Sequence, residues 1–319
     1  MSSGAIILAA GSAEGGKDLR PLICVGGRPM IRRIADTLAE LPVSPVVVVT
    51  GSRQEAVQKC LSGFNARFVF NRRYTSTDML ASLKLGLQAL DRPGCERILV
   101  IPSDLPLVSV NTISLLLQAD GEAVIPSYNG QRGHPIVLSA AAAAKIEGFE
   151  GEGGLREAIS ALTEPLVIPV QDRAVLMDVN SREEYNELAE YEAVMSGSAQ
   201  LHLKCDFSLA VNKAVIDGDT ILLLNMVDCT GSLQTASDCV GISYSKAWRQ
   251  IKALERELNS TLVTSAAGGS GGGGTRLSEA AKFLVESYQN MLAYGKNVSK
   301  VMFDAFFSNE IVKKIQNQG

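Results

Sequence analysis

The sequence of 319 residues has little histidine, no paired cysteines and no long apolar run. Its two histidines are His134 and His202, so we do not expect a histidine-rich metal centre. The six cysteines contain no C-x-x-C pair, which argues against a thiolate zinc site and against a disulfide framework. Their scatter is typical of reduced thiols in a cytoplasmic protein.

No stretch reaches the roughly 18 consecutive apolar residues that a membrane-spanning helix requires. The apolar run at residues 5–10 is too short for the core of a signal peptide. The net charge is −4, and residues 201–319 carry 12 Lys and Arg against 11 Asp and Glu, so the chain does not resemble one that coats nucleic acid throughout. We therefore expect a soluble, cytoplasmic protein without a membrane partner.

The length and the 46% hydrophobic content predict two globular domains. Over the first 190 residues, β-branched apolar runs alternate with helix-length segments, which indicates an α/β domain with a mostly parallel sheet and helices on both faces. This alternation stops near residues 190–208. We predict a first domain over residues 1–194, a linker over 195–208 and a mainly α-helical domain over 209–319.

Parallel sheets bind ligands beyond the carboxyl ends of their strands, so the loops after Leu8, Thr50, Phe70 and Ile101 are candidate sites. After Leu8 comes a glycine-rich turn with Lys17 and Arg20. Glycines allow backbone N–H groups to converge on phosphate oxygens, and the two cations could neutralise phosphate charge. A simple tight connection between strand and helix would give the same pattern.

Asp104 directly follows another apolar run, Arg97-Ile98-Leu99-Val100-Ile101. A carboxylate at the end of a buried parallel strand suits Mg²⁺, which prefers a few carboxylates together with substrate oxygens. The alternative is that Asp104 caps the turn before Pro106. At this position we favour the metal ligand.

Six motifs follow in an order that resembles the molybdenum cofactor cytidylyltransferases and their MobA/MocA-type relatives. They are Leu8-Ala9-Ala10-Gly11, Gly26-Gly27-Arg28-Pro29-Met30, Thr77-Asp78-Met79-Leu80-Ala81-Ser82, Ser103-Asp104-Leu105-Pro106, Gly130-Gln131-Arg132-Gly133-His134-Pro135 and Met177-Asp178-Val179-Asn180. The resemblance implies a Rossmann-like nucleotidyltransferase that joins the CMP of CTP to molybdopterin cofactor and releases pyrophosphate. The Leu-Ala-Ala-Gly motif favours cytidylyl over guanylyl transfer.

The resemblance also implies residue roles. Asp104 would be catalytic and would bind Mg²⁺ with Asp178 or Asn180. From the residues themselves, we add Lys17 and Arg20 as catalytic cations and His134 as a substrate-loop or structural residue. No general base is required, since the attacking phosphate is already an anion. The candidate nucleotide-binding residues are Leu8, Ala9, Ala10, Gly11, Gly15, Gly16, Thr50, Asp78, Ser82 and Ser103. The candidate substrate loop is Arg132, Gly133, His134 and Pro135.

One departure from the family concerns the first loop, where Gly15 stands in place of the usual phosphate-binding Arg. Lys17 and Arg20 could compensate, although Lys lacks the bidentate geometry of Arg. Three interpretations stay open: a working transferase with a rebuilt loop, a transferase with another substrate, and a fold retained as a ligand sensor.

The C-terminal part has the segment pattern of a helix-turn-helix, in which Gly231 and Gly241 separate three helix-length segments. On the third segment, apolar residues form one face and Lys246, Arg249, Lys252 and Arg256 form another. A basic stripe can be a solvated surface, but on a recognition helix it favours the major groove. The candidate DNA-binding residues are Ser243, Tyr244, Ser245, Lys246, Arg249, Lys252, Arg256 and Arg276.

The runs Gly241-Ile242-Ser243-Tyr244-Ser245-Lys246-Ala247-Trp248 and Gly268-Gly269-Ser270-Gly271-Gly272-Gly273-Gly274 resemble the winged helix-turn-helix of ModE-type molybdate-responsive regulators. By composition alone the second run could instead be a linker. The resemblance implies a wing tip at these glycines, double-stranded DNA as partner, core packing of Trp248, and a homodimer formed through the last helix. Since the separate molybdate-binding domains of these regulators do not follow, any sensor would be the first domain.

Overall fold

The computed structural model describes residues 2–11, 19–90, 94–151, 153–162, 164–179, 181–196, 203, 205, 207–265 and 274–307. The chain divides into two compact units, residues 1–192 and residues 193–319. The linker proposed at residues 195–208 stays a prediction, and residues 197–202, 204 and 206 of it lie outside the described residues.

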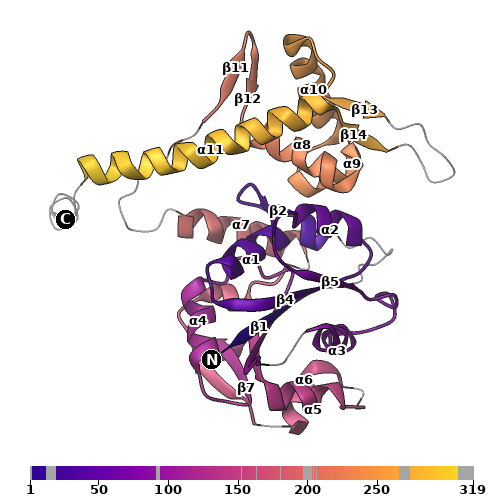
Figure 1. Ribbon diagram of the computed structural model, residues 1–319, viewed down its shortest axis with the longest axis vertical. Helices are drawn as coiled ribbons and strands as arrows, with labels where there is room; N and C mark the ends of the chain where they lie inside the picture. The colour runs from indigo at the N-terminus through magenta and orange to yellow at the C-terminus, as the bar shows by residue number, and fades with distance from the viewer. Residues whose placement is uncertain are drawn as a thin grey trace. The chain divides into compact units, whose positions relative to one another are not determined.

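The first unit is built on an eight-stranded sheet with the order β10-β7-β9-β6-β1-β4-β5, in which β8 pairs with β7 (Figure 1). Strands β1, β4, β5 and β6 run parallel, β10 is parallel to β7, and β9 is antiparallel to both its neighbours. The strands are β1 Ser3–Ala9, β4 Val43–Thr50, β5 Arg67–Phe70, β6 Arg97–Pro102, β7 Ala123–Tyr128, β8 Gln131–Arg132, β9 Ile136–Ser139 and β10 Leu166–Pro169.

The predicted fold class is confirmed: the sheet is mostly parallel and carries helices on both faces. Every residue of β1 and β6 is buried, which explains why these strands read as continuous apolar runs rather than as alternating patterns. Helices α3 (Met79–Ala89), α5 (Ala140–Glu147) and α6 (Gly154–Leu162) cover one face, while α1 (Met30–Ala39), α2 (Gln54–Cys60) and α4 (Val110–Gln118) lie on the other (Figure 1).

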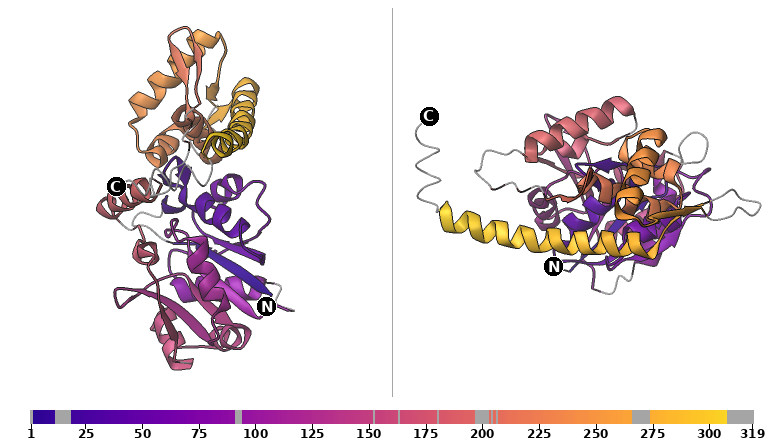
Figure 2. Two further views of the ribbon diagram at one scale, coloured as in Figure 1. Left: turned by 90° about the vertical axis from the view of Figure 1, so that its left-hand side faces the viewer. Right: turned by 90° about the horizontal axis from the view of Figure 1, so that it is seen from above.

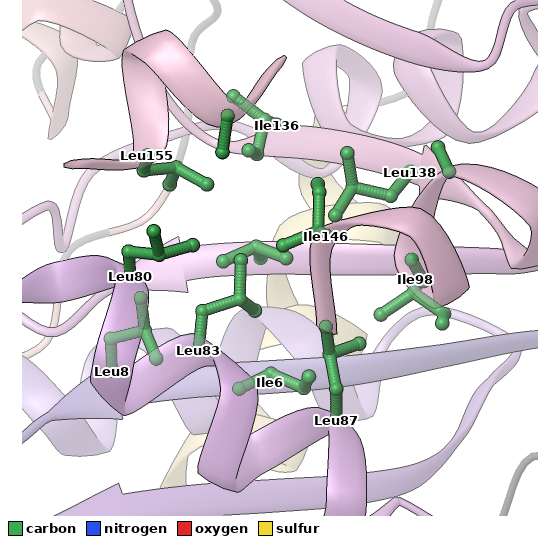
Figure 3. Packing of buried hydrophobic residues seen from close by; sticks show 14 of the residues in the cluster. Ile6, Leu8, Leu80, Leu83, Leu87, Ile98, Ile136, Leu138, Ile146 and Leu155 are labelled. Atoms are coloured by element: carbon green, nitrogen blue, oxygen red, sulfur yellow. The ribbon is translucent and has the colours of Figure 1, made fainter. Parts of the chain in front are cut away.

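One hydrophobic core of this unit lies between the sheet and the layer of α3, α5 and α6 (Figure 3). Ile6 and Ile98 from the sheet meet Leu83 and Leu87 of α3 there, and all four side chains are fully buried. Gly86 brings α3 close to β1, since a Cβ on it would lie 2.6 Å from Cγ2 of Ile6. This packing fixes the start of α3 beside the carboxyl end of β1.

A second, smaller cluster surrounds the hairpin of β2 (Cys24–Val25) and β3 (Arg28–Pro29). Helix α7 (Arg182–Ser196) packs on it through Leu188, and the hydroxyl of Tyr185 donates to the carbonyl of Cys24 at 2.8 Å. Two short 3₁₀ helices, η1 (Arg20–Leu22) and η2 (Arg173–Leu176), complete the unit. Both lie beside the carboxyl edge of the sheet, because Arg20 and Leu176 line the same pocket as the ends of β1 and β6.

The second unit contains the hairpin β11 (Leu209–Val211) and β12 (Ala214–Ile216), the helices α8 (Gly218–Thr230), α9 (Leu233–Val240) and α10 (Tyr244–Leu258), and the hairpin β13 (Val263–Ser265) and β14 (Thr275–Leu277). Asp217, Ser232 and Ser243 cap the three helices at their N-termini. Gly231 and Gly241 end α8 and α9 in the left-handed conformation, with φ of 67° and 81°. The predicted helix-turn-helix is therefore formed.

Helix α11 (Glu279–Phe306) is one continuous helix whose C-terminal half extends away from the other elements of its unit (Figures 1 and 2). Its first turns are anchored by the buried residues Ala281, Val285 and Tyr288. The hydroxyl of Tyr288 donates to the carbonyl of Phe207 at 2.5 Å. Among the described residues, no helix combines the length and apolar character needed to cross a bilayer.

Candidate functional site

A pocket of about 420 Å³ opens at the carboxyl edge of the central strands, in the size range of small-molecule sites. Residues that follow β1, β5 and β6 line it, together with residues of η1, α3, η2 and the segment between β8 and β9. The candidate residues that the pocket brings together are Leu8, Ala10, Gly11, Arg20, Asp78, Ser82, Ser103, Asp104, Arg132, Gly133, His134 and Asp178.

The other candidates lie elsewhere or cannot be placed. Thr50 is fully buried and its hydroxyl donates to the carbonyl of Val69 at 3.2 Å, so its side chain does not line the pocket. Ala9 and Pro135 are also buried and outside the lining. The candidates Gly15, Gly16, Lys17 and Asn180 lie outside the described residues.

The pocket contains an ion pair between Arg20 of η1 and Asp104 at the end of β6. Nη1 of Arg20 lies 3.6 Å from Oδ2 of Asp104, and the two side chains are 25% and 19% exposed. Both groups are therefore partly desolvated yet accessible from the pocket. A cation bound by Asp104 and an anion bound by Arg20 would be direct neighbours.

Asn71, which directly follows β5, organises one wall of the pocket and was not among the residues expected from the sequence. Its amide donates to the hydroxyls of Thr77 at 2.9 Å and Ser82 at 3.2 Å, and both of these residues line the pocket. Asn71 is only 3% exposed, so this arrangement is rigidly enclosed. The signal in the sequence was its position at the carboxyl end of a strand, in a loop already marked as a candidate.

Asp78 has a structural task beside any role in binding. Its Oδ1 accepts a hydrogen bond from the backbone N–H of Ala81 at 2.9 Å, which caps the first turn of α3. The cap fixes the N-terminus of α3 at the pocket, where the helix dipole favours anions.

The segment of residues 131–134 is held against η2, a 3₁₀ helix that the sequence did not reveal. The backbone N–H of His134 donates to the carbonyl of Val175 at 2.9 Å, and the N–H of Gly133 donates to the carbonyl of Pro126 at 2.9 Å. A Cβ on Gly133 would lie 2.2 Å from the same Val175 oxygen. Only glycine allows this approach of two backbone segments.

Replacing Gly133 by alanine is therefore expected to displace the 131–134 segment from η2. Since the obstacle is a backbone oxygen, we expect a loss of about 2 kcal/mol in unfolding free energy and about ten-fold weaker binding of any ligand in the pocket. Thermal unfolding and ligand titration measure both effects. Gly148→Ala is the matched control, because its Cβ would meet its nearest neighbour at 3.7 Å. Equal losses of unfolding free energy and of ligand affinity in the two variants would contradict the role of Gly133.

His134 lines the pocket as a neutral side chain. Burial lowers the pKa of its imidazole, and the negative charge of Asp178 opposes this shift without reversing it. Its Nδ1 is buried and makes no hydrogen bond to the part of the chain that the structure describes. A neutral imidazole here fits a positioning role rather than that of a general acid.

Asp104 and Asp178 are the two carboxylates that line the pocket without capping a helix within the described ranges. Those ranges contain no cluster of three or more Asp, Glu, His or Cys residues that could hold a metal alone. Two carboxylates nevertheless suit Mg²⁺, which completes its six oxygen ligands with water and phosphate. The donor set therefore fits a cation that arrives with a phosphorylated ligand.

A second pocket of about 740 Å³ adjoins the first, and the 131–134 segment lines both. It is more apolar, with Ile125, Ile136, Leu155 and Ile159 in its walls. The unit thus offers a polar pocket with cationic and anionic groups beside an apolar one.

In the second unit, α10 presents the basic face that the sequence predicts. Ala247, Ile251 and Leu254 are buried on one side, while Lys246 and Arg249 are exposed on the other. The exposed candidates on this unit are Ser243, Tyr244, Ser245, Lys246, Arg249, Arg256 and Arg276, and Lys252 is half-buried. Ser243 also caps α10, because its hydroxyl accepts from the N–H of Lys246 at 3.3 Å. Of the glycine run, residues 268–273 lie outside the described residues.

The expectation that Trp248 packs in the core is wrong, since its side chain is 39% exposed. It follows the buried Ala247 by one residue, which rotates it by about 100° around the helix, away from the buried face. Its ring stacks on that of Tyr244, with centroids 6.4 Å apart and an angle of 10° between the planes.

Glu255 connects α10 to the hairpin β13–β14. Its carboxylate accepts from the backbone N–H groups of Leu262 at 2.8 Å and Val263 at 3.1 Å, and from Nζ of Lys252 at 2.6 Å. Burial raises the pKa of Glu255, but the hydrogen bonds from Lys252, Val263 and Leu262 outweigh it, so that the net pKa is lowered.

A lowered pKa in the folded state means that the ionised Glu255 stabilises this unit above pH 4.5, its ordinary value, and that the contribution disappears as the pH falls below it. We expect Glu255→Gln to lower the unfolding free energy by about 1 kcal/mol at pH 7. Denaturant unfolding of both proteins between pH 3.5 and 7 should show the difference shrinking toward acid. A difference that does not change with pH would contradict this assignment.

Comparison with known proteins identifies the family of the first unit. Residues 5–166 match the MobA-like NTP transferase domain over just more than half of the chain. The chain belongs to the MobA-like NTP transferase family. Residues 219–282, which include the helix-turn-helix, match the bacterial regulatory helix-turn-helix proteins of the lysR family. The second unit therefore contains a bacterial regulatory helix-turn-helix.

Individual relatives match one part of the chain each. The bifunctional protein GlmU of Nitratidesulfovibrio vulgaris is 31% identical over 126 residues, which cover 39% of this chain and 27% of that protein. The molybdenum-pterin-binding protein MopB of Rhodobacter capsulatus is 36% identical over 75 residues, and the molybdenum transport protein ModE of Herbaspirillum seropedicae is 34% identical over 76, each covering 24% of this chain and 28% of the relative. The chain thus spans about a quarter of the length of these relatives.

The fold of the MobA-like domain also occurs in solved structures. A nucleotidyl transferase from Methanothermobacter thermautotroptrophicus superposes with a TM-score of 0.52 and 21% identity, over 61% of this chain and 99% of that one. At this identity the similarity shows the fold alone. It agrees with the mostly parallel sheet of the first unit.

Proposed function

We propose that the MobA-like domain transfers the CMP of CTP to molybdopterin cofactor, and that the helix-turn-helix unit binds double-stranded DNA. The observation that carries the first half is the polar pocket, where Arg20 and Asp104 lie 3.6 Å apart at the carboxyl edge of the sheet. The choice of a molybdenum-related acceptor is supported by the similarity of the second unit to the molybdenum-pterin-binding protein MopB and the molybdenum transport protein ModE.

In the proposed reaction, a phosphate oxygen of the cofactor forms a bond to the α-phosphorus of CTP, while the bond from that phosphorus to the bridging oxygen breaks and pyrophosphate leaves. The attacking oxygen is already anionic, so no proton needs to be removed. Asp104 and Asp178 would hold Mg²⁺, which neutralises phosphate charge when bound.

The chain's own residues align and neutralise the reacting groups. Arg20 offers a cation for the triphosphate, Gly11 lines the pocket, and the N-terminus of α3 offers backbone N–H groups. The adjoining apolar pocket suits the flat, uncharged part of an acceptor, with residues 131–134 between the two ligands. Neutral His134 would position the acceptor rather than exchange protons with it.

The test is pyrophosphate release by the intact chain with Mg²⁺, molybdopterin cofactor and CTP, GTP or ATP in turn. Release with CTP that depends on the cofactor supports the proposal. Release with another nucleotide would make the chain a transferase of different specificity. Absence of release with all three would leave the alternative, a transcription regulator whose first domain senses nucleotide or cofactor, which the missing loop Arg at Gly15 favours.

For the second half, we expect Arg249→Ala to weaken binding to duplex DNA about ten-fold and to flatten the logarithmic salt dependence by about 0.9, the value of one phosphate contact. Arg249 is exposed near the centre of the face of α10 opposite to Ala247 and Ile251. Fluorescence anisotropy between 50 and 200 mM salt measures both quantities. The control is Lys282→Ala, which removes an exposed cation of α11 that pairs with Glu279. An unchanged slope for Arg249→Ala would contradict a phosphate contact.

A further inference from the structure

Two aromatic side chains on α10, Tyr244 and Trp248, form an exposed stacked pair that we name the aromatic pair. Their side chains are 44% and 39% exposed, and their ring planes lie within 10° of parallel. Residues four apart on a helix share one face, so the stack is a fixed feature of the helix surface. It offers a rigid apolar edge to a partner without further loss of side-chain freedom.

The surroundings of the aromatic pair are cationic. Nζ of Lys252 lies 4.6 Å from the centre of the Trp248 ring, and Arg249 follows Trp248 directly along the exposed face. Lys252 also pairs with Glu255, while Lys246 and Arg249 are exposed elsewhere on the surface of α10 and Ala247 and Ile251 occupy its buried side. The exposed surface of α10 thus combines apolar rings with cations, which matches a polyanion that also displays apolar groups.

Duplex DNA displays such groups in its major groove, where each thymine carries a 5-methyl group among base edges and flanking phosphates. We propose that the aromatic pair reads thymine by packing against these methyl groups, so that it determines sequence specificity while Arg249 and Lys246 bind phosphate. This inference rests on the proposed binding of DNA by α10. The position of Tyr244 in the first turn of α10 agrees with it, since the N-terminal residues of a recognition helix meet base edges.

The test begins with duplexes that the intact chain selects from a randomised pool. Selected half-sites should contain a fixed thymine, and replacing that thymine by uracil, which removes only the methyl group, should weaken binding about four-fold. Replacing the T·A pair by C·G should weaken binding about ten-fold or more. In Trp248→Ala the thymine and uracil duplexes should bind equally, because the group that senses the methyl is absent. Tyr244→Ala should also reduce the preference for the thymine duplex over the uracil duplex.

Phe283→Ala is the matched control, since Phe283 is an exposed aromatic of the same unit on α11, with 73% exposure. It should retain the four-fold preference for thymine over uracil. Circular dichroism establishes that each variant is folded, and Trp248→Phe, which keeps an aromatic ring, should retain part of the preference.

The outcomes separate this inference from the proposed function. If the intact chain binds and selects DNA but does not distinguish thymine from uracil, the inference is overturned while DNA binding stands. If Trp248→Ala changes the subunit number instead, the aromatic pair is covered by a second copy and the inference is also overturned. If the intact chain binds no duplex at low salt, the proposed DNA binding itself fails.

Discussion

Replacing Asp104 by asparagine is expected to reduce pyrophosphate release about a thousand-fold. The two side chains have nearly the same shape, but the amide lacks the charge that would hold a divalent cation against the triphosphate. It also removes the negative charge that lies 3.6 Å from Nη1 of Arg20. We expect the main loss in kcat, since the charge of the leaving pyrophosphate develops in the transition state.

Asp36→Asn is the control, because Asp36 pairs with Arg28 and Arg32 on the surface and does not line the pocket. It should retain full activity. If both carboxylates hold one cation, Asp178→Asn should also reduce activity. Added Mg²⁺ should diminish the loss of activity in Asp178→Asn. An Asp104→Asn protein that keeps its activity would contradict the role of Asp104 as the cation ligand.

Replacing Val301 by aspartate is expected to convert a dimer into a monomer and to weaken binding to a two-fold DNA site about a hundred-fold. The C-terminal half of α11 exposes an apolar stripe in which Tyr294 and Val301 lie seven residues apart, as in a coiled coil, and they are 73% and 69% exposed. Val298, Met302 and Phe306 extend the stripe. In the dimer expected from the sequence, a charge in its middle would face the helix of the second copy.

Light scattering measures the change, with twice 33.9 kDa expected for the unmodified chain and 33.9 kDa for the variant. Gln289→Asp, which adds the same charge at an exposed polar position of α11, should remain dimeric. A monomeric unmodified chain would contradict the dimer expected from the sequence. In that case the stripe has another partner.

Much of the fold was predictable because its signals are local. The short, β-branched apolar runs that became β1 and β6 indicated strands buried on both faces. Gly231 and Gly241 marked the helix ends where left-handed backbone was required. The antiparallel strand β9 was not predictable, because alternating strands and helices indicate parallel neighbours, whereas β9 pairs antiparallel with both β6 and β7.

The site was only partly predictable, because some of its contacts depend on how the loops fold. Asp104 and Gly11 lie where parallel strands end, and this rule needs only the strand positions. Asn71 acts through Thr77 and Ser82, and Gly133 acts through Val175, contacts that depend on how loops fold back. The exposure of Trp248 depends on the rotation of α10, which a resemblance to other helices does not fix.

The central claim is that the polar pocket binds a magnesium nucleotide through Asp104. Isothermal titration calorimetry of the intact chain with CTP, with Mg²⁺ and then with EDTA, tests it most directly. We predict saturable binding with one nucleotide per chain in Mg²⁺, at least ten-fold weaker binding in EDTA, and the same loss in Asp104→Asn. Absence of heat with CTP, GTP and ATP in Mg²⁺, or binding that neither EDTA nor Asp104→Asn affects, would contradict it.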